Sequence, residues 1–429
     1  MSELDYWNAR LLKGAISRRE FMGRAAALGA SSVAGSTMLA SADARADDAQ
    51  AELTLTFGGD VNFTSSRETP QADEATKGGR VMSFQSVLAG IADLIDGDLN
   101  FANLETVVTD RSDLPDTGGR FVFSTHPKAV ETAISAGINL FSLANNHAGD
   151  HGPEGMLETL RNMDDLARHH HIYYSGLGLE RDQVLTPKVF TVSTQTGQYV
   201  VAFLAMTAIS NTPSQAGDNR LGVAYIQDKR DFDEAMRRMA AVRADYKILS
   251  VHGGTEGSIT VDGWQRTLYR QALVQGDIDL VLGAHPHRVR PADRVGEKLI
   301  FYSLGNYAML GAANINGGGV NMDYGLLGKV YLDWNANRTR LVAKAAEAIP
   351  LVDMHISPHK FNANEGYRRI QALNGQASSQ LGSSALLFAP DSNGEGSVCL
   401  SDEGRGPRAE LICQKLQSRS QASDKISRP

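Results

Sequence analysis

Hydrophobic and polar positions follow two different periods along the central part of the chain. Short runs that are apolar at every second position, or continuously apolar, predict β-strands, whereas stretches with apolar residues every three or four positions predict helices. The predicted strands are 53–57, 99–102, 138–144, 200–205, 248–251, 280–282 and 299–302, and the predicted helices are 84–95, 128–136, 155–167, 232–243 and 264–275. Strands that alternate with helices indicate an α/β fold with parallel strands and helices packed over them.

The last part of the chain departs from this alternation. Residues 326–332 and 341–350 predict an antiparallel pair of strands that closes a second sheet. After about Pro358 the sequence becomes rich in Gly, Ser, Asn, Gln and Arg, and from about Gln417 it has no periodicity. We therefore expect a main domain over residues 47–357 and a C-terminal appendage over 358–429 that is partly disordered.

The N-terminal residues have the pattern of an export signal. Ser17-Arg18-Arg19-Glu20-Phe21-Met22 is a twin-arginine pattern, a mildly apolar stretch follows it over residues 25–40, and Ala44-Arg45-Ala46 is a small-x-small cleavage site. We interpret residues 1–46 as a Tat signal that is cleaved after Ala46, which predicts a periplasmic or extracellular protein. The alternative interpretations are a retained membrane anchor and an ordinary helix start, but the apolar stretch is short for a membrane span.

Composition and charge narrow the class of protein. The chain has 429 residues, of which 42% are hydrophobic and 21% charged, and this is ordinary for a globular protein with a sizeable core. The net charge of −7 and the lack of a cationic run argue against nucleic acid as a partner. Cys399 and Cys413 are the only cysteines, so a disulfide and two free thiols are both open, while a structural zinc site would need more ligands.

Polar side chains with metal-binding atoms follow five of the predicted strands. The segment Gly283-Ala284-His285-Pro286-His287 is the most distinctive, because residues two apart on extended backbone face the same side and imidazole is a common metal ligand. The complete set is Asp60, Asn62, Glu105, Asn146, His147, His252, His285 and His287. Each residue alone is more often structural, but ligands of open α/β sheets gather at the carboxyl ends of strands. Carboxylate, amide and imidazole together, without thiolate, predict a site for divalent Mn, Fe, Zn or Co.

These segments resemble the capsule synthesis CapA family, the poly-γ-glutamate biosynthesis group. The resemblance rests on Gly59-Asp60-Val61, Asn103-Leu104-Glu105, Ala144-Asn145-Asn146-His147 followed by Asp150 and Gly152, Val251-His252-Gly253-Gly254 with Glu256, Gly283 to His287, and Tyr302 to Asn306, all in the expected order. That family is itself similar to calcineurin-like metallophosphoesterases, which implies a four-layer α/β/β/α sandwich with a two-metal site. It implies that Glu105 bridges two metal ions and that the remaining ligands are Asp60, Asn62, Asn146, His252, His285 and His287.

The sequence also departs from the phosphoesterase pattern. Asn62 stands where those enzymes carry a histidine, and a carboxamide is a weaker ligand. Gly253 and Gly254 follow His252 where an aromatic residue is usual, which suggests a more open pocket. The segment 123–127 replaces a usual Phe-Arg pair and removes a cation that could have met an anionic substrate.

The resemblance leads to three functional hypotheses. The first is a metal-dependent, phosphoesterase-like hydrolase in poly-γ-glutamate or capsular polymer production, with His147 as the general acid, an anionic polymer or phosphoester as substrate and a membrane synthase as a further partner. The second is a non-catalytic polymer-binding or synthase-associated scaffold of the cell envelope, and the third is a periplasmic phosphomonoesterase or nucleotidase. The expected substrate-binding residues are Asn103, Asn145, Glu256, Arg288, Arg290 and Asn306. Arg288 and Arg290 could instead form surface salt bridges, and Asn306 could simply occupy a turn.

Overall fold

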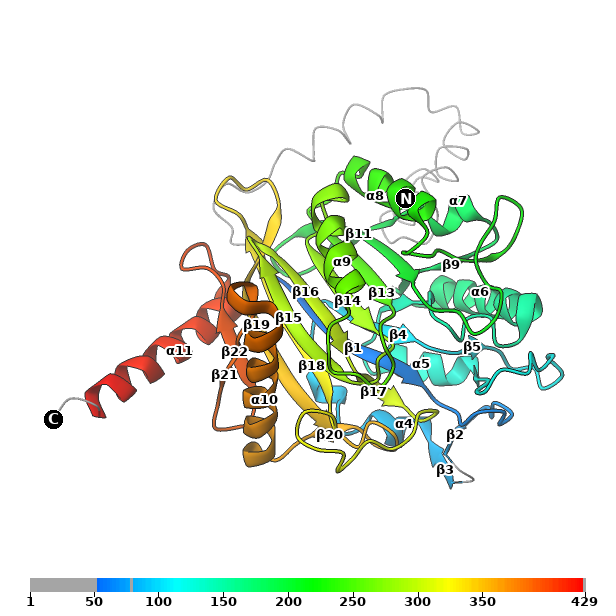
Figure 1. The fold of residues 1–429 in the computed structure, drawn as a ribbon, viewed down its shortest axis with the longest axis horizontal. Coiled ribbons are helices and arrows are strands. Elements are labelled where there is room, and N and C mark those ends of the chain that lie inside the picture. Colours follow the sequence, from blue (N-terminus) through cyan, green and yellow to red (C-terminus); the bar gives the residue numbers. More distant parts are fainter. Residues whose placement is uncertain (1–51, 78–79, 427–429) are drawn as a thin grey trace, which may run out of the picture. The chain divides into compact units, whose positions relative to one another are not determined.

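The computed structural model describes residues 52–77 and 80–426. In the last helix, the side chains are described as far as Ser418. The expected Tat signal over residues 1–46 lies outside the described residues. The compact unit that contains the described residues runs from Gln50 to Pro429. Figure 1 labels its helices and strands.

The largest sheet of the described residues has ten strands and contains both the first and the last strand of the fold. The strand order is β21-β22-β19-β18-β1-β4-β7-β8, with β17 paired to β1 and β20 paired to β19. The parallel strands are β1 (Leu53–Asn62), β4 (Leu99–Leu104), β7 (Leu140–Ser142), β8 (Tyr173–Ser175) and β17 (Asn306–Met309). The antiparallel strands are β18 (Gly325–Trp334), β19 (Leu341–Val352), β20 (His359–Lys360), β21 (Ala389–Pro390) and β22 (Gly396–Cys399).

The second sheet has six strands and packs face to face on the first. Its order is β10 (Lys188–Ser193), β11 (Gln198–Thr207), β13 (Tyr246–His252), β14 (Leu280–Ala284), β16 (Lys298–Leu304) and β15 (Val289–Val295). Phe203 and Phe301 contact Phe101 and Phe57 of the first sheet, with ring centroids 6.0 and 4.8 Å apart. The neighbouring residues along β11, Ala202 and Leu204, point instead into a separate core beneath the helices, as the period of two requires.

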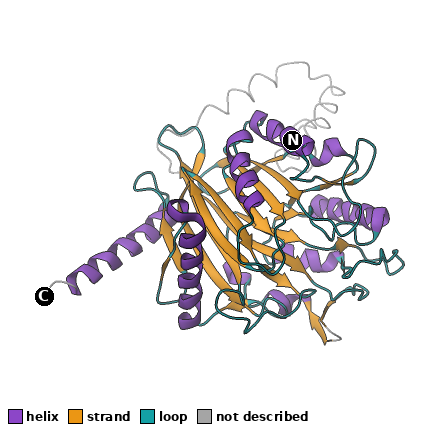
Figure 2. Cartoon of the chain, viewed as in Figure 1, coloured by secondary structure: helices purple, strands orange, loops and turns teal. Residues whose placement is uncertain are grey.

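Helices cover the outer faces of both sheets, so the layers are α/β/β/α (Figures 1 and 2). On the second sheet, Met236 and Met239 of α8 (Lys229–Ala241) and Leu273 of α9 (Gly263–Gln275) pack against β13 and β14. On the first sheet, α4 (Phe84–Leu88), α5 (Pro127–Ser135) and α6 (Gly152–His169) connect successive parallel strands. The predicted four-layer fold is confirmed.

The remaining elements complete the structure. They are β2 (Glu74–Lys77), β3 (Arg80–Ser83), η1 (Ala92–Leu94), β5 (Val107–Val108), β6 (Ser124–Thr125), β9 (Leu177–Gly178), α7 (Arg181–Val184), β12 (Gly222–Val223), α10 (Ala363–Leu381), η2 (Gly382–Ser384) and α11 (Pro407–Ile426). Among the helices of the described residues, we find none long and apolar enough to cross a membrane.

One expectation for the C-terminal part needs correction. The antiparallel pair β18 and β19 does not close a second sheet, because β18 pairs with β1 and so extends the first sheet. In the described part of the expected appendage over 358–429, β20 and β22 pair with β19, and α10 buries Ile370, Leu373 and Ala377. These buried positions do have helical spacing, but the polar residues between them hide it in the sequence.

Cys399 and Cys413 form a disulfide. The bond joins β22 to α11, and Cys413 is fully buried beside Tyr331 and Ala345. The C-terminal helix is therefore linked covalently to the larger sheet.

Candidate metal centre

The carboxyl ends of five strands meet where the two sheets face each other. Asp60 lies in β1, Glu105 directly follows β4, and the segment 145–147 follows β7. From the second sheet, His252 ends β13 and His285 directly follows β14. The parallel direction of the strands within each sheet brings these ends together.

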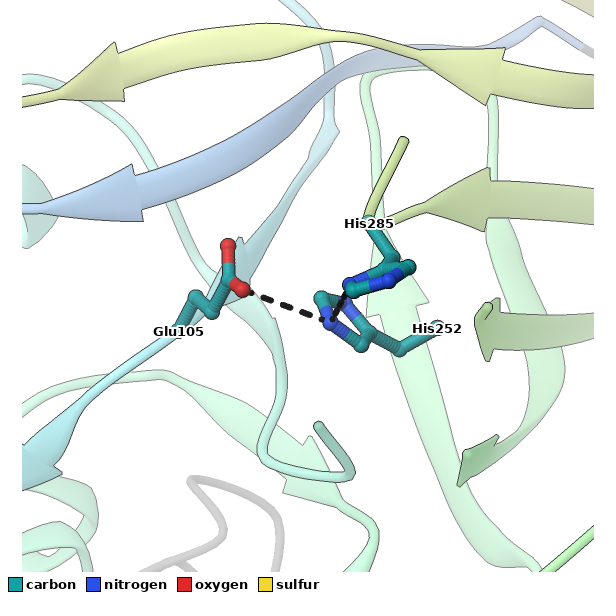
Figure 3. Close-up of side chains that lie close together, drawn as sticks. All are labelled: Glu105, His252 and His285. Carbon is teal, nitrogen blue, oxygen red and sulfur yellow. Dashed lines mark hydrogen bonds and ion pairs between the residues drawn. The ribbon is translucent and has the colours of Figure 1, made fainter. Parts of the chain in front are cut away.

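One group of ligand atoms comprises Glu105, His252 and His285, whose side-chain atoms lie within 4.8 Å of one another. The Nε2 atom of His252 lies 3.1 Å from Nδ1 of His285 and 3.4 Å from Oε1 of Glu105. Figure 3 shows the carboxylate and the two rings converging. The Oδ1 atom of Asn146 is 2.6 Å from the same Nε2 atom, so Asn146 supplies a fourth candidate ligand.

A second group comprises Asp60, Glu105 and His287. The Nδ1 atom of His287 lies 3.3 Å from Oδ2 of Asp60, and it donates a hydrogen bond to Oδ1 of Asn306 at 2.7 Å. Because Glu105 belongs to both groups, its position is that of a carboxylate shared between two cation sites.

Glu105 is the group least explained without a cation. Its side chain is 0% exposed, and neither carboxylate oxygen has a hydrogen-bond partner among the described residues. Burial, together with the charge of Asp60, raises the pKa of Glu105 to about 8. An isolated buried carboxylate is costly, and metal coordination is one of the few ways to compensate it, so the residues present fit a divalent cation.

The pKa values of the other ionisable groups in the two clusters are also shifted. Burial lowers the pKa of His252 to about 3 and that of His285 well below its usual value, so both imidazoles are neutral and able to bind a metal. Burial alone would lower the pKa of His287, but the charge of Glu105 and the hydrogen bond to Asp60 raise it to about 10. Burial favours the neutral form of Asp60, yet the hydrogen bond and charge of His287 outweigh it and lower the pKa of Asp60.

The backbone of the His285-Pro286-His287 segment is not extended, in contrast to the expectation. His285 has φ 97° and His287 has φ 52°, and both lie outside the strands β14 and β15. Positive φ is unfavourable for residues other than glycine and is typically held by the surrounding structure at functional sites. The two imidazoles consequently serve different groups of ligands rather than one face of a strand.

Asn62 does not have the orientation expected of a ligand. Its carboxamide oxygen accepts hydrogen bonds from the backbone N–H of Thr64 at 3.0 Å and from the hydroxyl of Thr125 at 3.1 Å. The oxygen is the atom that an asparagine offers to a cation, and here it is bonded to protein donors. The structure therefore does not support Asn62 as a metal ligand.

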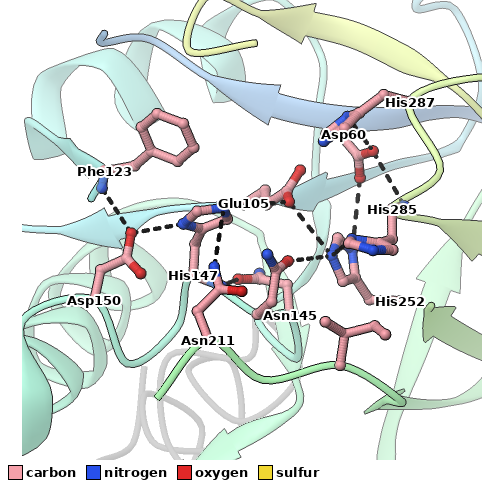
Figure 4. Close-up of polar contacts among 12 residues, drawn as sticks. Asp60, Glu105, Phe123, Asn145, His147, Asp150, Asn211, His252, His285 and His287 are labelled. Atoms are coloured by element: carbon pink, nitrogen blue, oxygen red, sulfur yellow. Dashed lines mark hydrogen bonds and ion pairs between the residues drawn. The ribbon is translucent and has the colours of Figure 1, made fainter. Parts of the chain in front are cut away.

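His147 lies beside the clusters in a fixed orientation. Its Nδ1 atom is 2.6 Å from Oδ2 of Asp150, which also accepts the backbone N–H of Phe123, and the Phe123 ring packs on the imidazole with centroids 4.4 Å apart. The Nε2 atom lies 3.9 Å from Oε1 of Glu105 and 3.5 Å from Nδ2 of Asn211. Figure 4 shows this chain of contacts from Asp150 to the ligands. His147 can therefore present Nε2 to a group bound next to Glu105.

A cavity of about 390 Å³ opens onto the centre and is lined by His147, Asn146, His285 and His287. Two of the expected substrate-binding residues, Glu256 and Arg288, line its rim. Arg120 also lines it, so a cation stands near the segment 123–127 after all. Gly253 does not leave the expected open space, because Ala208 and the ring of Trp264 occupy the place of its side chain.

The other expected substrate-binding residues lie behind the ligands. Asn103 donates to Asp60 at 2.8 Å and lies 3.0 Å from His252, and Asn306 contacts His287, so both position ligands. Asn145 bonds to the backbone of Leu104 and His147. Arg290 is 1% exposed, and its guanidinium donates to Asp262, Gln265 and the carbonyls of Thr255 and Ser258. Arg290 thus has a structural role instead of the expected contact with a substrate.

Sequence reasoning assigned no role to Asp150, Asn211 or Arg120. Asp150 had a signal, because it belongs to the motif that begins at Asn145 and lies three residues after His147. Asn211 and Arg120 lie in loops without a recognisable sequence motif, and only the fold brings them to the cavity.

The protein family described as bacterial capsule synthesis protein PGA_cap matches residues 54–309 of this sequence. The chain belongs to this family. The match confirms the resemblance predicted from the motifs, and it includes every candidate ligand from Asp60 to His287. The buried cluster described above therefore lies within the part of the chain that matches the PGA_cap family.

Several curated proteins are related to the chain. The PGA biosynthesis protein CapA of Bacillus subtilis is 25% identical over 262 residues, which cover 59% of this chain and 63% of that protein. The capsule biosynthesis protein CapA of Bacillus anthracis is 27% identical over 191 residues, covering 43% of each. A probable polyglutamine synthesis accessory protein of Mycobacterium tuberculosis, Rv0574c, is 26% identical over 217 residues, covering 49% of this chain and 55% of that protein. The chain thus matches only part of the length of these relatives.

The chain is also similar to solved structures. The calcineurin-like phosphoesterase YfkN of Bacillus subtilis has a TM-score of 0.39 at 12% identity and covers 77% of this chain and 98% of its own. GAP50 of Plasmodium, described as the anchor in the inner membrane complex, has a TM-score of 0.34 at 10% identity and covers 75% and 95%. Because these TM-scores are low, the description of the architecture rests on the strand order and layers of this chain alone.

Proposed function

We propose that the protein is a metal-dependent hydrolase that acts in the production of a capsular or poly-γ-glutamate polymer. The observation that carries the proposal is Glu105, a fully buried carboxylate that accepts no hydrogen bond from the described residues and belongs to both groups of candidate ligands. Glu105, Asn146, His252 and His285 would hold one divalent cation, and Asp60, Glu105 and His287 would hold a second. Mn, Fe and Zn suit this mixture of oxygen and nitrogen donors.

The protein residues have separate tasks in such a reaction. Divalent cations, when bound, polarise the bond to be cleaved and lower the pKa of water. Asn103 and Asn306 hold the ligands in place from behind. Asp150 fixes the imidazole of His147 through Nδ1, so that Nε2 can hold a proton and give it to the oxygen of the leaving group.

The family and the N-terminal motif support the proposed polymer, cell compartment and partners. Two related proteins are named for PGA or capsule biosynthesis. Arg120 and Arg288 at the cavity rim suit an anionic polymer or a phosphoester as substrate. Export by the Tat pathway would place the protein in the periplasm or outside the cell, where a membrane synthase is the expected partner.

Metal content and turnover test the proposal together. Purified protein loaded with Mn²⁺ or Zn²⁺ is analysed by mass spectrometry for metal per chain and assayed with p-nitrophenyl phosphate and bis-p-nitrophenyl phosphate. We expect His285→Ala to lose bound metal and turnover, whereas the exposed control His359→Ala keeps both. Wild-type protein with less than about one metal per chain, and no turnover of either ester, would contradict the enzymatic function.

A non-catalytic envelope scaffold is the second candidate, and the orientation of Asn62 favours it. With the oxygen of Asn62 bonded to Thr64 and Thr125, the second cation group has only three candidate ligands. In that case His285→Ala would lose metal but leave polymer production by the cells unchanged. Turnover of the monoester alone would instead favour a periplasmic phosphomonoesterase.

A further inference from the structure

A second cavity lies beside the one that opens onto the candidate metal centre. Its volume is about 470 Å³, and the residues that line it include Asn211, Thr212, Gln215, Arg220 and Tyr225. Asn211 also lines the first cavity, so the two cavities adjoin at this residue. A substrate longer than the first cavity could therefore extend from the metal centre past Asn211 into the second.

The segment between the two cavities is held against the loop that carries His147. The backbone N–H of Asn211 donates to the carbonyl oxygen of Asn146 at 3.5 Å, and the hydroxyl of Thr212 donates to the carbonyl oxygen of Gly149 at 3.1 Å. The Nδ2 atom of Asn211 lies 3.5 Å from Nε2 of His147, a contact that is drawn in Figure 4. The second cavity therefore begins on the side of the metal centre where His147 lies.

The chemistry of the second cavity favours an anion. None of the residues that line it is acidic, although the chain has a net charge of −7. The exposed Arg220 donates from Nε to the carbonyl oxygen of Gln215 at 3.0 Å, which holds one edge of its guanidinium. No described residue accepts a hydrogen bond from its two terminal nitrogens, and Asp218 in the same turn pairs with Arg230 instead. A guanidinium with a free edge suits a carboxylate.

We propose that the second cavity binds the continuation of an anionic chain whose bond to be cleaved lies at the metal centre, and that Arg220 binds a carboxylate of that chain. The inference deepens the proposed hydrolase function and rests on it for the direction of the chain. His147 would give its proton to the leaving oxygen, so the leaving part of the chain would lie toward Asn211. Arg120 and Arg288 in the first cavity would bind the other part. A chain with repeated carboxylates can occupy both cavities, whereas a small phosphomonoester needs only the first.

The test separates binding in the second cavity from turnover at the metal centre. The probe is a tetramer of γ-linked glutamate, and its affinity for the metal-loaded full chain is measured by calorimetry. The variants are Arg220→Ala and Arg220→Lys, which keeps the charge. The control is Arg266→Ala, which removes another exposed arginine that donates to a backbone carbonyl and lines neither cavity. Thermal unfolding and metal per chain show whether each variant is intact, and turnover of p-nitrophenyl phosphate is measured on the wild type.

We expect Arg220→Ala to bind the tetramer about tenfold or more weakly than the wild type, because hydrogen bonds between two charged groups are lost. Arg220→Lys should keep part of the affinity, and Arg266→Ala should keep all of it. No binding of the tetramer by the wild type, unchanged affinity in Arg220→Ala or an equal loss in Arg266→Ala would overturn the inference. With ester turnover intact, these results would leave the hydrolase function standing. Binding that depends on Arg220 in a wild-type protein without turnover would refute that function and keep the second cavity as a polymer-binding site.

Discussion

Metal binding to the centre should release protons, and Glu105 should determine how its affinity changes with pH. The carboxyl group has a pKa of about 8 in the metal-free protein, so at pH 7 it is mostly protonated. A cation needs the ionised form, and the proton must leave when the cation binds. Because the pKa of Glu105 is raised to about 8, a proton competes with the cation for the carboxylate below pH 8 and no longer does so above it. His252, with a pKa of about 3, and His285 are already neutral and release nothing.

The size of the pH effect on cation affinity follows from the release of one proton. Between pH 7 and pH 6 the affinity for the first cation should fall about tenfold, which is about 1.4 kcal/mol. A second cation would also displace the proton of His287, whose pKa is about 10, so its affinity should keep rising above pH 8. Asp60 has a lowered pKa and stays ionised throughout this range.

Calorimetry measures both quantities. Mn²⁺ is titrated into the protein at pH 6, 7 and 8, each in two buffers that differ in heat of ionisation, and the difference gives the number of protons released. We expect about one proton for the first cation at pH 7, and weak binding without this proton in Glu105→Gln. An affinity that is the same at pH 6 and pH 7, with no proton released, would refute the assignment of Glu105 as a buried ligand.

Three further predictions concern other parts of the molecule. Replacing Cys399 and Cys413 by Ser should lower the free energy of unfolding by about 3 kcal/mol in urea titrations while metal per chain stays unchanged, because the bond closes a short loop; equal stability would show that the bond does not form. His147→Ala should reduce the turnover number roughly 10²- to 10⁴-fold without loss of metal, and unchanged turnover would exclude it as the general acid. Gly59→Ala should destabilise the fold by about 1–3 kcal/mol or more, because its Cβ would lie 1.8 Å from the carbonyl oxygen of Gly305, whereas Gly375→Ala in α10 meets nothing within 4 Å and should stabilise by about 0.5–1 kcal/mol. Thermal unfolding of the two variants distinguishes these results, and a destabilising Gly375→Ala would argue against an ordered α10.

The ends of the parallel strands could be predicted because a few neighbouring residues are enough to indicate each strand. The hydrophobic runs that end at Asp60, Glu105, His252 and His285 are each visible in a few residues, and the rule that ligands gather at carboxyl ends supplies the rest. What a short pattern does not contain is the direction of each side chain. Asn103 lies near the carboxyl end of β4, where a ligand would be expected, but its amide contacts Asp60 and His252 from behind.

Tertiary contacts decided the other differences. Arg290 follows the histidine segment by three residues, and only the packing of the 255–265 loop shows that internal acceptors bind its guanidinium. The positive φ of His285 and His287 could not be predicted, because no glycine marks a turn there. The helix α10 was missed because Ile370, Leu373 and Ala377 stand alone among polar residues, and its apolar partner surface on β15 and β19 lies far away in sequence.

The pairing of β1 with β18 has a consequence for the order in which the molecule can fold. The strand that carries Asp60 lies between β4 and β18, and β18 begins only at Gly325. A chain emerging from the ribosome therefore cannot pair residues 53–57 of this strand with β18 until some 270 further residues have been synthesised, and closing such a long loop is slow. The family match ends at residue 309, before β18, so its boundary is not a folding boundary. A fragment that stops there would leave residues 53–57 of β1 without their partner strand β18, and that part of the edge would be open to association with other chains.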